Sequence, residues 1–268
     1  MNLQQIIPAD KLIQLMIHLE LCFEIEPENE ESSLFIPAVF DDEMDSAAKG
    51  RRQLEWRLGR TGPFHYLGRR LECKDKSLMF LTPGFFPRLQ VHLRNYIHER
   101  SWTANPGFVV GRNLICFAEN GVEVCVEYSG DIDYFVDILV RSSKPYAAAL
   151  QFIKEHVMNK IVQFCASPQG CQGVLLVEAV IRPACVSALH LCVDRKDHSV
   201  LVSDLKALIA EDDAYEYTWR QKTEDVRDTE FARDLLEGEG SHISLLAASQ
   251  LSLVPAVPSS RGTQLQPQ

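Results

Sequence analysis

The sequence predicts an α+β protein in which a partial winged-helix-like unit precedes a larger mixed or antiparallel sheet with packed helices. Three patterns support this fold class. Apolar residues recur at helical spacing over 8–25, 85–99 and 144–166. Short apolar or alternating runs of strand length lie between and around these segments. Asn120-Gly121 separates two of the runs and is the strongest short hairpin signal in the chain.

The first unit begins with an amphipathic helix. Its apolar residues follow the i, i+3, i+4, i+7 spacing of one helix face: Leu12, Leu15, Met16 and Leu19. A short strand over 22–25, an acidic turn and a second strand over 34–40 follow. This order of helix, strand, turn and strand is typical of the end of a winged-helix unit. A linker helix over 41–62, ending at Gly62-Pro63, completes the segment 1–60.

The second unit, 61–183, holds most of the predicted sheet. We expect its elements in this order: strands 64–72 and 77–81, helix 85–99, strands 113–119 and 122–128, strand 134–142, helix 144–166 and a last, central strand over 173–183. Residues 184–268 form the third segment, a helical extension with a disordered C-terminal tail. Its helices are expected over 200–213 and 223–238.

The charge is unevenly distributed along the chain. Acidic residues outnumber basic ones 37 to 27 over 268 residues, which gives a net charge of −10. Residues 1–48 carry 11 acids and 1 base, whereas 49–100 carry 12 bases and 4 acids. The negative total opposes a general nucleic-acid coat, because phosphate binding needs positive charge. The basic segment is either a solvated face or a surface that docks an acidic partner domain or an anionic lipid.

Cysteine usage indicates a reducing compartment. Eight cysteines are spread singly, and several lie inside apolar strands, so we interpret them as reduced thiols in the core of a cytoplasmic protein. No secretory signal or membrane-spanning run is visible. The best zinc candidates have gaps of five and six residues, wider than zinc sites favour, and buried thiols are preferred: Cys165, Cys171, Cys185, His190 and Cys192.

Familiar catalytic and cofactor motifs are absent from the sequence. Neither a P-loop nor a dinucleotide fingerprint nor a nucleophile elbow occurs. Asp131, Asp133 and Asp137 lie on one face of a predicted strand, where they could bind a cation or act as acid and base, but a hydrated strand face is preferred. We therefore expect no catalytic residue, no cofactor and no metal site.

Two segments resemble the COR (C-terminal of Roc) domain of Roco proteins. Residues 7–40 are similar to the helix and wing that close its first half. The phrase F-L-x-P-G-x-F-x-R-L, typical of the opening of the second half, is present over 80–89. The conserved letters of this phrase are Phe80, Leu81, Pro83, Gly84, Phe86, Arg88 and Leu89. The resemblance covers roughly 6–183 and is nearest to plant Roco proteins of the TORNADO type.

The resemblance implies a cytosolic signalling protein in which COR couples a Roc GTPase domain to a dimer without catalysing a reaction. The Roc domain and the leucine-rich repeats are missing here, so the chain resembles a fragment of such a protein. Self-association and a Roc-like GTPase domain, in cis or in trans, are the implied protein partners. No nucleic acid and no membrane span are expected.

Interaction residues are expected on the helix over 85–99 and on the basic strand before it. Aromatic and arginine side chains are enriched at interface centres. The candidates are Phe86, Arg88, His92, Tyr96, Arg69 and Arg70, whereas Phe85 and Leu89 are assigned to the core. The alternative is a winged-helix-like module that binds nucleic acid or an anionic surface through the basic 49–100 segment, although the acidic predicted wing would repel phosphate.

Overall fold

A computed structural model describes the chain over 8–25, 33–39, 64–75, 81–82, 84–100, 109–129, 135–181, 186, 199–211, 217–219, 222–224 and 236. The predicted linker helix over 41–62 and most of the predicted strand over 77–81 lie outside these residues, as do Cys185, His190 and Cys192. The α+β class is confirmed: helices accompany one large antiparallel sheet and a small two-stranded sheet.

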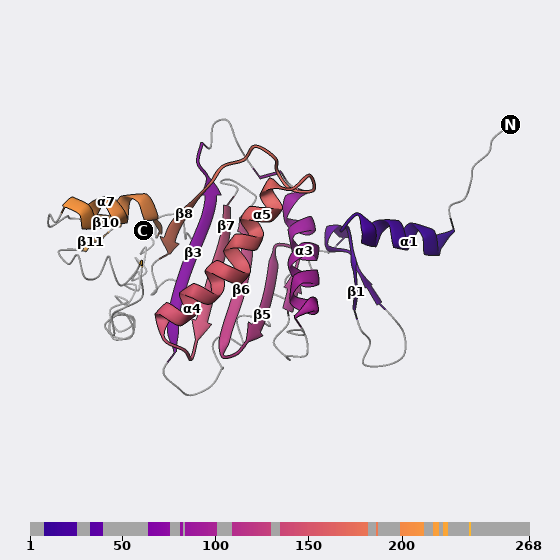
Figure 1. Ribbon diagram of the computed structural model, residues 1–268, viewed down its shortest axis with the longest axis horizontal. Coiled ribbons are helices and arrows are strands. Elements are labelled where there is room, and N and C mark those ends of the chain that lie inside the picture. The colour runs from indigo at the N-terminus through magenta and orange to yellow at the C-terminus, as the bar shows by residue number, and fades with distance from the viewer. Residues whose placement is uncertain are drawn as a thin grey trace, which may run out of the picture.

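The first unit has the predicted order of elements. Helix α1 (Ala9–His18) leads to strand β1 (Phe23–Ile25), which pairs antiparallel with β2 (Ser33–Phe35). A short 3-10 turn, η1 (Pro37–Val39), follows. Pro8 precedes the helix in an extended conformation, where its missing N–H leaves no hydrogen bond unmade. In Figure 1 this unit lies beside the large sheet, with α1 pointing away from it.

Seven strands form the large sheet: β3 (His65–Cys73), β4 (Val109–Gly111), β5 (Leu114–Glu119), β6 (Val122–Ser129), β7 (Phe135–Ser142), β8 (Leu176–Ile181) and β9 (Ser199–Leu201). Their order is β4-β5-β6-β7-β3-β8-β9, and all paired neighbours are antiparallel. The strand expected over 173–183 is β8, which pairs on both sides, with β3 and with β9. Its expected central position was wrong, because β8 lies next to the edge strand β9 and β7 is the middle strand. At three residues, β4 and β9 are too short to give a periodic signal.

The hairpin between β5 and β6 turns at the predicted dipeptide. Asn120 and Gly121 have φ values of 50° and 79°, the left-handed pair that a type I′ turn needs. Ser143 closes the turn from the next connection, since its backbone N–H donates to the carbonyl of Gly121 at 3.0 Å. The turn fixes the register of β5 on β6, and with it the face to which each side chain points.

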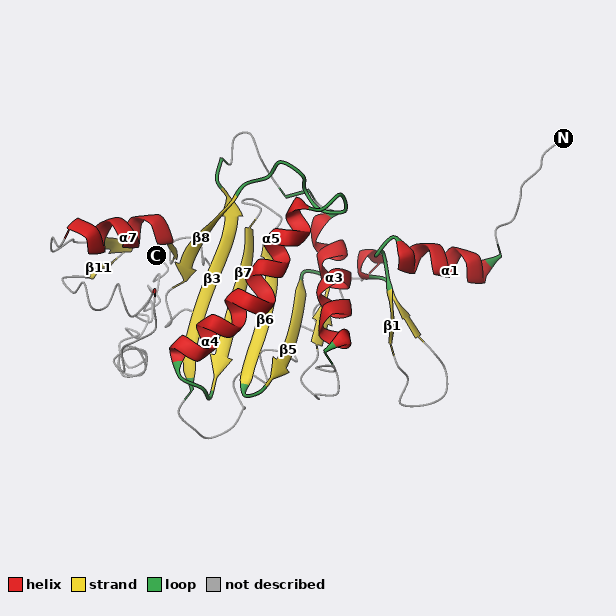
Figure 2. Ribbon diagram, in the orientation of Figure 1, coloured by secondary structure: helices red, strands yellow, loops and turns green. Residues whose placement is uncertain are grey.

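A helical layer covers one face of the sheet. Figures 1 and 2 show a long helical rod running diagonally across the sheet, with α3 (Phe85–Glu99) beside it. The rod comprises α4 (Tyr146–Ile153), the π-helical turn η3 (Lys154–Met158) and α5 (Asn159–Ala166). The sequence predicted it as one regular helix. The rod packs on the sheet through its own side chains Ile153, Val157 and Ile161, which are fully buried. It is therefore the main cover of this face of the sheet.

The opposite face of the sheet holds a second, smaller apolar cluster. One row of cross-strand neighbours passes through Val109, Cys116, Cys125, Leu139, Gly68 and Ile181. All the apolar members are buried. Gly68 is required here, because a Cβ at this position would approach Ile181 Cβ to 2.7 Å and Val186 Cγ2 to 2.8 Å. The strand can cross this cluster only without a side chain.

The C-terminal segment contributes to the same sheet. Helix α7 (Val202–Glu211) confirms the helix predicted over 200–213, and β9 leads directly into it. Strands β10 (Tyr217–Trp219) and β11 (Lys222–Glu224) form a separate antiparallel pair. The helix predicted over 223–238 begins within β11, and most of its remaining residues lie outside the described chain. The division of the chain at 60 and 183 stays a prediction.

Candidate functional site

Helix α1 presents an apolar stripe to solvent. Leu12, Leu15 and Leu19 are 45%, 46% and 47% exposed, and none of the ten residues of α1 is buried. Val39 in η1 is more exposed still. Complete burial of a leucine side chain stabilises a fold by about 1.5–3 kcal/mol, so the three half-exposed leucines leave much of that free energy unrealised. Several exposed apolar side chains on one helix face are the pattern of a surface that binds another protein.

The end of α1 is tied to helix α3. The chain leaves α1 at Glu20, whose φ of 53° reverses its direction. The Glu20 carboxylate lies 3.8 Å from Nδ1 of His92 on α3. Three residues later the Phe23 ring packs against the Phe35 ring with centroids 4.8 Å apart. The guanidinium carbon of the buried Arg94 on α3 lies 5.3 Å from the centre of the Phe23 ring. The Glu20–His92 contact and a cation–π contact thus join the first unit to α3.

Helix α3 divides the predicted interaction residues into two groups. Phe86 is fully buried and stacks on Tyr128 at a centroid distance of 5.4 Å, so its ring belongs to the core. Phe85 and Leu89 are also fully buried, which confirms their assignment to the core. Arg88 and His92 are partly exposed on the other side of the helix. Arg88 Nε donates to the carbonyl of Gly84 at 3.3 Å, across the first turn of α3.

Tyr96 forms a partly exposed polar contact between α3 and the helical rod. Its hydroxyl lies 2.9 Å from Nδ1 of His156 in the π turn. Two cations flank its ring, Arg100 at 4.8 Å and Lys160 at 4.7 Å from the centroid. Burial, followed by the field of Arg100, lowers the pKa of His156 below its ordinary value, and the neutral imidazole is favoured. Burial raises the pKa of Tyr96, which keeps the phenol protonated.

The two arginines predicted to face a partner are buried on opposite faces of β3. Arg69 lies on the helical face, where its Nε is 2.9 Å from Oε1 of Glu178 in an ion pair. Its guanidinium also donates to the Gly68 carbonyl at 3.0 Å and to the Tyr146 hydroxyl at 3.3 Å. Arg69 is 0% exposed, so it is part of the interior of the sheet unit.

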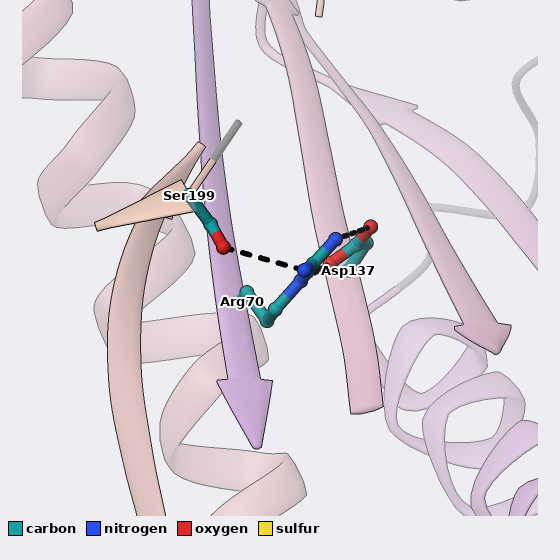
Figure 3. A network of polar contacts seen from close by, with 3 residues as sticks. All are labelled: Arg70, Asp137 and Ser199. Carbon is teal, nitrogen blue, oxygen red and sulfur yellow. Dashed lines mark hydrogen bonds and ion pairs between the residues drawn. The ribbon is translucent and has the colours of Figure 1, made fainter. Parts of the chain in front are cut away.

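Arg70 occupies the opposite face with a full set of partners. Its Nε and Nη2 donate to the two carboxylate oxygens of Asp137 at 2.8 and 3.0 Å, and its Nη1 donates to Ser199 Oγ at 3.3 Å (Figure 3). The Phe135 ring lies 3.6 Å from the guanidinium carbon. The expected hydrated face at Asp137 was wrong, because its register opposite Arg70 supplies a buried countercharge. Arg69, Arg70 and Arg94 are therefore directed inward, not toward a phosphate backbone or an acidic partner.

The described residues contain no group of three His, Cys, Asp or Glu side chains arranged to hold a metal ion. Among the helices of this part of the chain, none has the length and hydropathy to cross a membrane. The six described cysteines are all buried, as the sequence predicted, and none of them is in a disulfide.

The exposed stripe and the His156 contact were not identified as site features from the sequence. The periodicity of α1 shows that an apolar face exists, but it cannot show how far the described part of the chain leaves that face exposed. Tyr96 and His156 are 60 residues apart, and no local pattern pairs them.

Comparison with known proteins identifies one relationship at the level of sequence. The chain is 34% identical to Protein TORNADO 1 of Arabidopsis thaliana over 216 residues. The match covers 79% of this chain and 15% of TORNADO 1, so the chain spans a small part of that relative's length. No protein-family model matches the chain.

Proposed function

The chain belongs to the Roco family through its relation to TORNADO 1, a Roco protein, and we propose that it is a COR-type module that acts by binding protein domains. In this proposal the module catalyses no reaction. It associates with a second copy of itself and couples that association to a Roc-like GTPase domain, present in cis or in trans, within cytosolic signalling. The observation that carries the proposal is the exposed apolar stripe of α1.

The chemistry of the stripe fits a protein partner. Leu12 and Leu15 on the ten-residue helix and Leu19, its C-cap residue, are unbranched at Cβ and follow the spacing of one helix face. A helix of this kind binds a groove or a matching helix through residues at i, i+3, i+4 and i+7. We therefore propose that α1 is the self-association surface.

Contacts at the end of α1 support a coupling role. A partner that shifts α1 also moves Glu20 and Phe23, which contact His92 and Arg94 on α3. Helix α3 in turn packs its buried face on the sheet through Phe86 and Leu93. Because packed helices move as rigid bodies, a displacement at α1 reaches the sheet unit through α3.

The nucleic-acid alternative has less support. Arg69, Arg70 and Arg94 are the described arginines of the basic segment with the least exposure, and each is engaged within the protein. A side chain that is buried in an ion pair cannot neutralise a phosphate without breaking that pair.

The test is the concentration dependence of the mass in solution. Light scattering of the full chain at rising concentration should show a shift from monomer to dimer. Leu15→Glu should return the protein to a monomer, because it places a charge in the proposed contact. Val162→Glu is the matched control, since Val162 on α5 is also 46% exposed but lies on the other unit. It should leave the dimer intact.

A monomeric mass at all concentrations would contradict self-association, and so would equal effects of the two variants. The coupling arm uses a Roc-like GTPase domain from a Roco protein as the probe. Its binding to the chain, measured by calorimetry, should weaken in His92→Ala relative to Arg88→Ala. Identical binding to both variants would contradict transmission through His92.

A further inference from the structure

We propose that Cys116 and Cys125 are a redox-sensitive modification site, at which a peroxide forms a cross-strand disulfide between β5 and β6. This inference is independent of the proposed interaction role. It rests on the pairing register of the hairpin, on the class of cross-strand pair that the two cysteines occupy, and on their different exposure.

The register places the two cysteines directly opposite each other. Cys116 on β5 is the Cα partner of Cys125 on β6, within an uninterrupted run from Leu114↔Glu127 to Glu119↔Val122. Directly opposed residues point to the same face of a sheet. Both thiols therefore lie in the second apolar cluster, between Val109 on one side and Leu139 on the other.

The hydrogen-bond pattern identifies the class of this pair. Tyr128 N–H donates to the Asn113 carbonyl at 3.0 Å, so these two residues form a hydrogen-bonded pair. Hydrogen-bonded and non-hydrogen-bonded pairs alternate along an antiparallel ladder. Three steps along the ladder, Cys116 and Cys125 form a non-hydrogen-bonded pair. In such pairs the Cα atoms are about 4.5 Å apart and the side chains are closest.

That separation suits a disulfide. Disulfide bonds join residues whose Cα atoms are about 4.4–6.8 Å apart, and the pair falls at the short end of this range. The bond would therefore form without separation of the strands. It would link two strands that the Asn120-Gly121 turn already holds in register, so no large rearrangement of the backbone is needed.

Exposure sets the order of the two steps. Cys116 is 8% exposed and lies beside β4, a three-residue edge strand, whereas Cys125 is fully buried. Short edge strands open locally at a low cost in free energy, which admits a small oxidant to Cys116. Its thiolate attacks the O–O bond of hydrogen peroxide and becomes a sulfenic acid, with release of hydroxide. The Cys125 thiol then displaces the hydroxyl group, and the S–S bond forms with release of water.

The reaction is balanced by the peroxide. Two thiols lose two electrons and two protons, and one peroxide molecule takes them up to give two water molecules. A thiol reductant reverses the step by exchange. The second group of cysteines provides an internal comparison. Burial raises the pKa of Cys165 to about 12, and the neighbouring Cys171 and Cys73 contribute, so this thiol is held protonated and unreactive.

Tryptic peptides make the test specific. No Lys or Arg lies between Arg112 and Arg141, so Cys116 and Cys125 fall in one peptide, 113–141. Trypsin does not cleave between Arg182 and Pro183, so Cys165 and Cys171 fall in peptide 161–195 together with Cys185 and Cys192. The folded full chain is treated with hydrogen peroxide, denatured, alkylated and digested, and the peptide masses are measured. Peptide 113–141 should lose about 2 Da, the two thiol hydrogens, and take up no alkyl group. Fragmentation of peptide 161–195 in the mass spectrometer should locate an alkyl group on Cys165 and another on Cys171.

Further digestion locates the bond. Cleavage after Glu119 and Glu123 should leave two pieces joined only through sulfur, and a reductant should separate them. Cys125→Ala should stop the reaction at the sulfenic acid of Cys116, which a dimedone probe traps. Two alkyl groups on peptide 113–141 after peroxide treatment would overturn the proposal. Equal oxidation of Cys165 and Cys171, or a bond from Cys116 to any other cysteine, would also overturn it.

Discussion

The apolar residues of the first unit and of the sheet unit differ in how much of their surface is exposed to solvent. In α1 every leucine of the stripe is about half exposed, whereas in α3 Phe85, Phe86 and Leu89 are fully buried. Both helices show the same kind of apolar periodicity in the sequence. The difference lies in the tertiary cover: α3 packs on a seven-stranded sheet, and α1 extends beyond a two-stranded hairpin. An amphipathic helix thus becomes a core element or a binding surface according to what lies beside it.

The largest expected effect concerns the buried charge of the sheet unit. Asp137→Ala should lower the free energy of unfolding by about 3–5 kcal/mol, because it leaves Arg70 buried without its countercharge. Urea unfolding followed by circular dichroism measures this loss. The double variant Arg70→Met with Asp137→Leu is the control and should lose much less, since no isolated charge remains. Equal losses would mean that side-chain volume, not charge, determines the result.

A matched leucine pair sharpens the comparison of the two helices. Leu89→Ala should cost about 2–5 kcal/mol of unfolding free energy, because it opens a cavity in the core. Leu15→Ala makes the same chemical change on α1 and should cost less than about 0.5 kcal/mol in the monomer. Urea unfolding at a concentration where the protein is monomeric provides both numbers. Similar costs would show that α1 is packed as tightly as α3.

Limited proteolysis compares the units directly. Few of the described side chains in the first unit are buried, so we expect residues 1–60 to be cleaved roughly tenfold faster than 63–183. Mass spectrometry of the early fragments identifies the surviving piece. Preferential survival of the N-terminal piece would reverse the order of stability that the burial pattern implies.

A small effect is expected at the polar contact of Tyr96. Tyr96→Phe removes one hydrogen bond to His156 and should cost about 0.5–1.5 kcal/mol. The pKa of His156 is lowered in the folded protein, so the unfolded chain binds more protons between that pKa and 6.5. Stability should therefore fall as the pH drops below 6.5. Unfolding at neutral and at mildly acidic pH measures this slope, which His156→Gln should reduce. An unchanged slope in that variant would assign it to other groups.

Much of the fold could be predicted from the sequence because local signals were strong. The helix over 85–99 and the turn at Asn120-Gly121 were located to the residue. Elements that depend on distant partners were missed. Strands β4 and β9 are three-residue edge strands, and each is formed by pairing with one neighbour, β5 and β8 respectively. The π turn arises inside a pattern that a regular helix also satisfies.

The candidate site was harder to predict because exposure is a property of the whole fold. From the sequence, Arg69 and Arg70 were predicted to lie at the surface, since they belong to a basic segment and arginine is rarely buried without a partner. Their partners Glu178 and Asp137 come from strands that are distant in sequence. The Arg69–Glu178 and Arg70–Asp137 pairs become visible only once the strand order is known. Because of these pairs, Arg69 and Arg70, two of the six expected interaction residues, are buried and not at the surface. His92 and Tyr96 stay partly exposed on the flank of α3 that borders the helical rod, where they contact Phe164 and His156.

The π turn over 154–158 has a consequence for how this protein tolerates changes in length. A π turn equals a regular helical turn with one residue inserted, which the wider coil absorbs locally. Deletion of a single residue within 154–158 would restore an ordinary helix while α4 and α5 keep the faces that cover the sheet. The same deletion in α3 would rotate every following side chain by about 100° and expose the core. Homologous chains can therefore differ by one residue at this turn and still share the same helical layer.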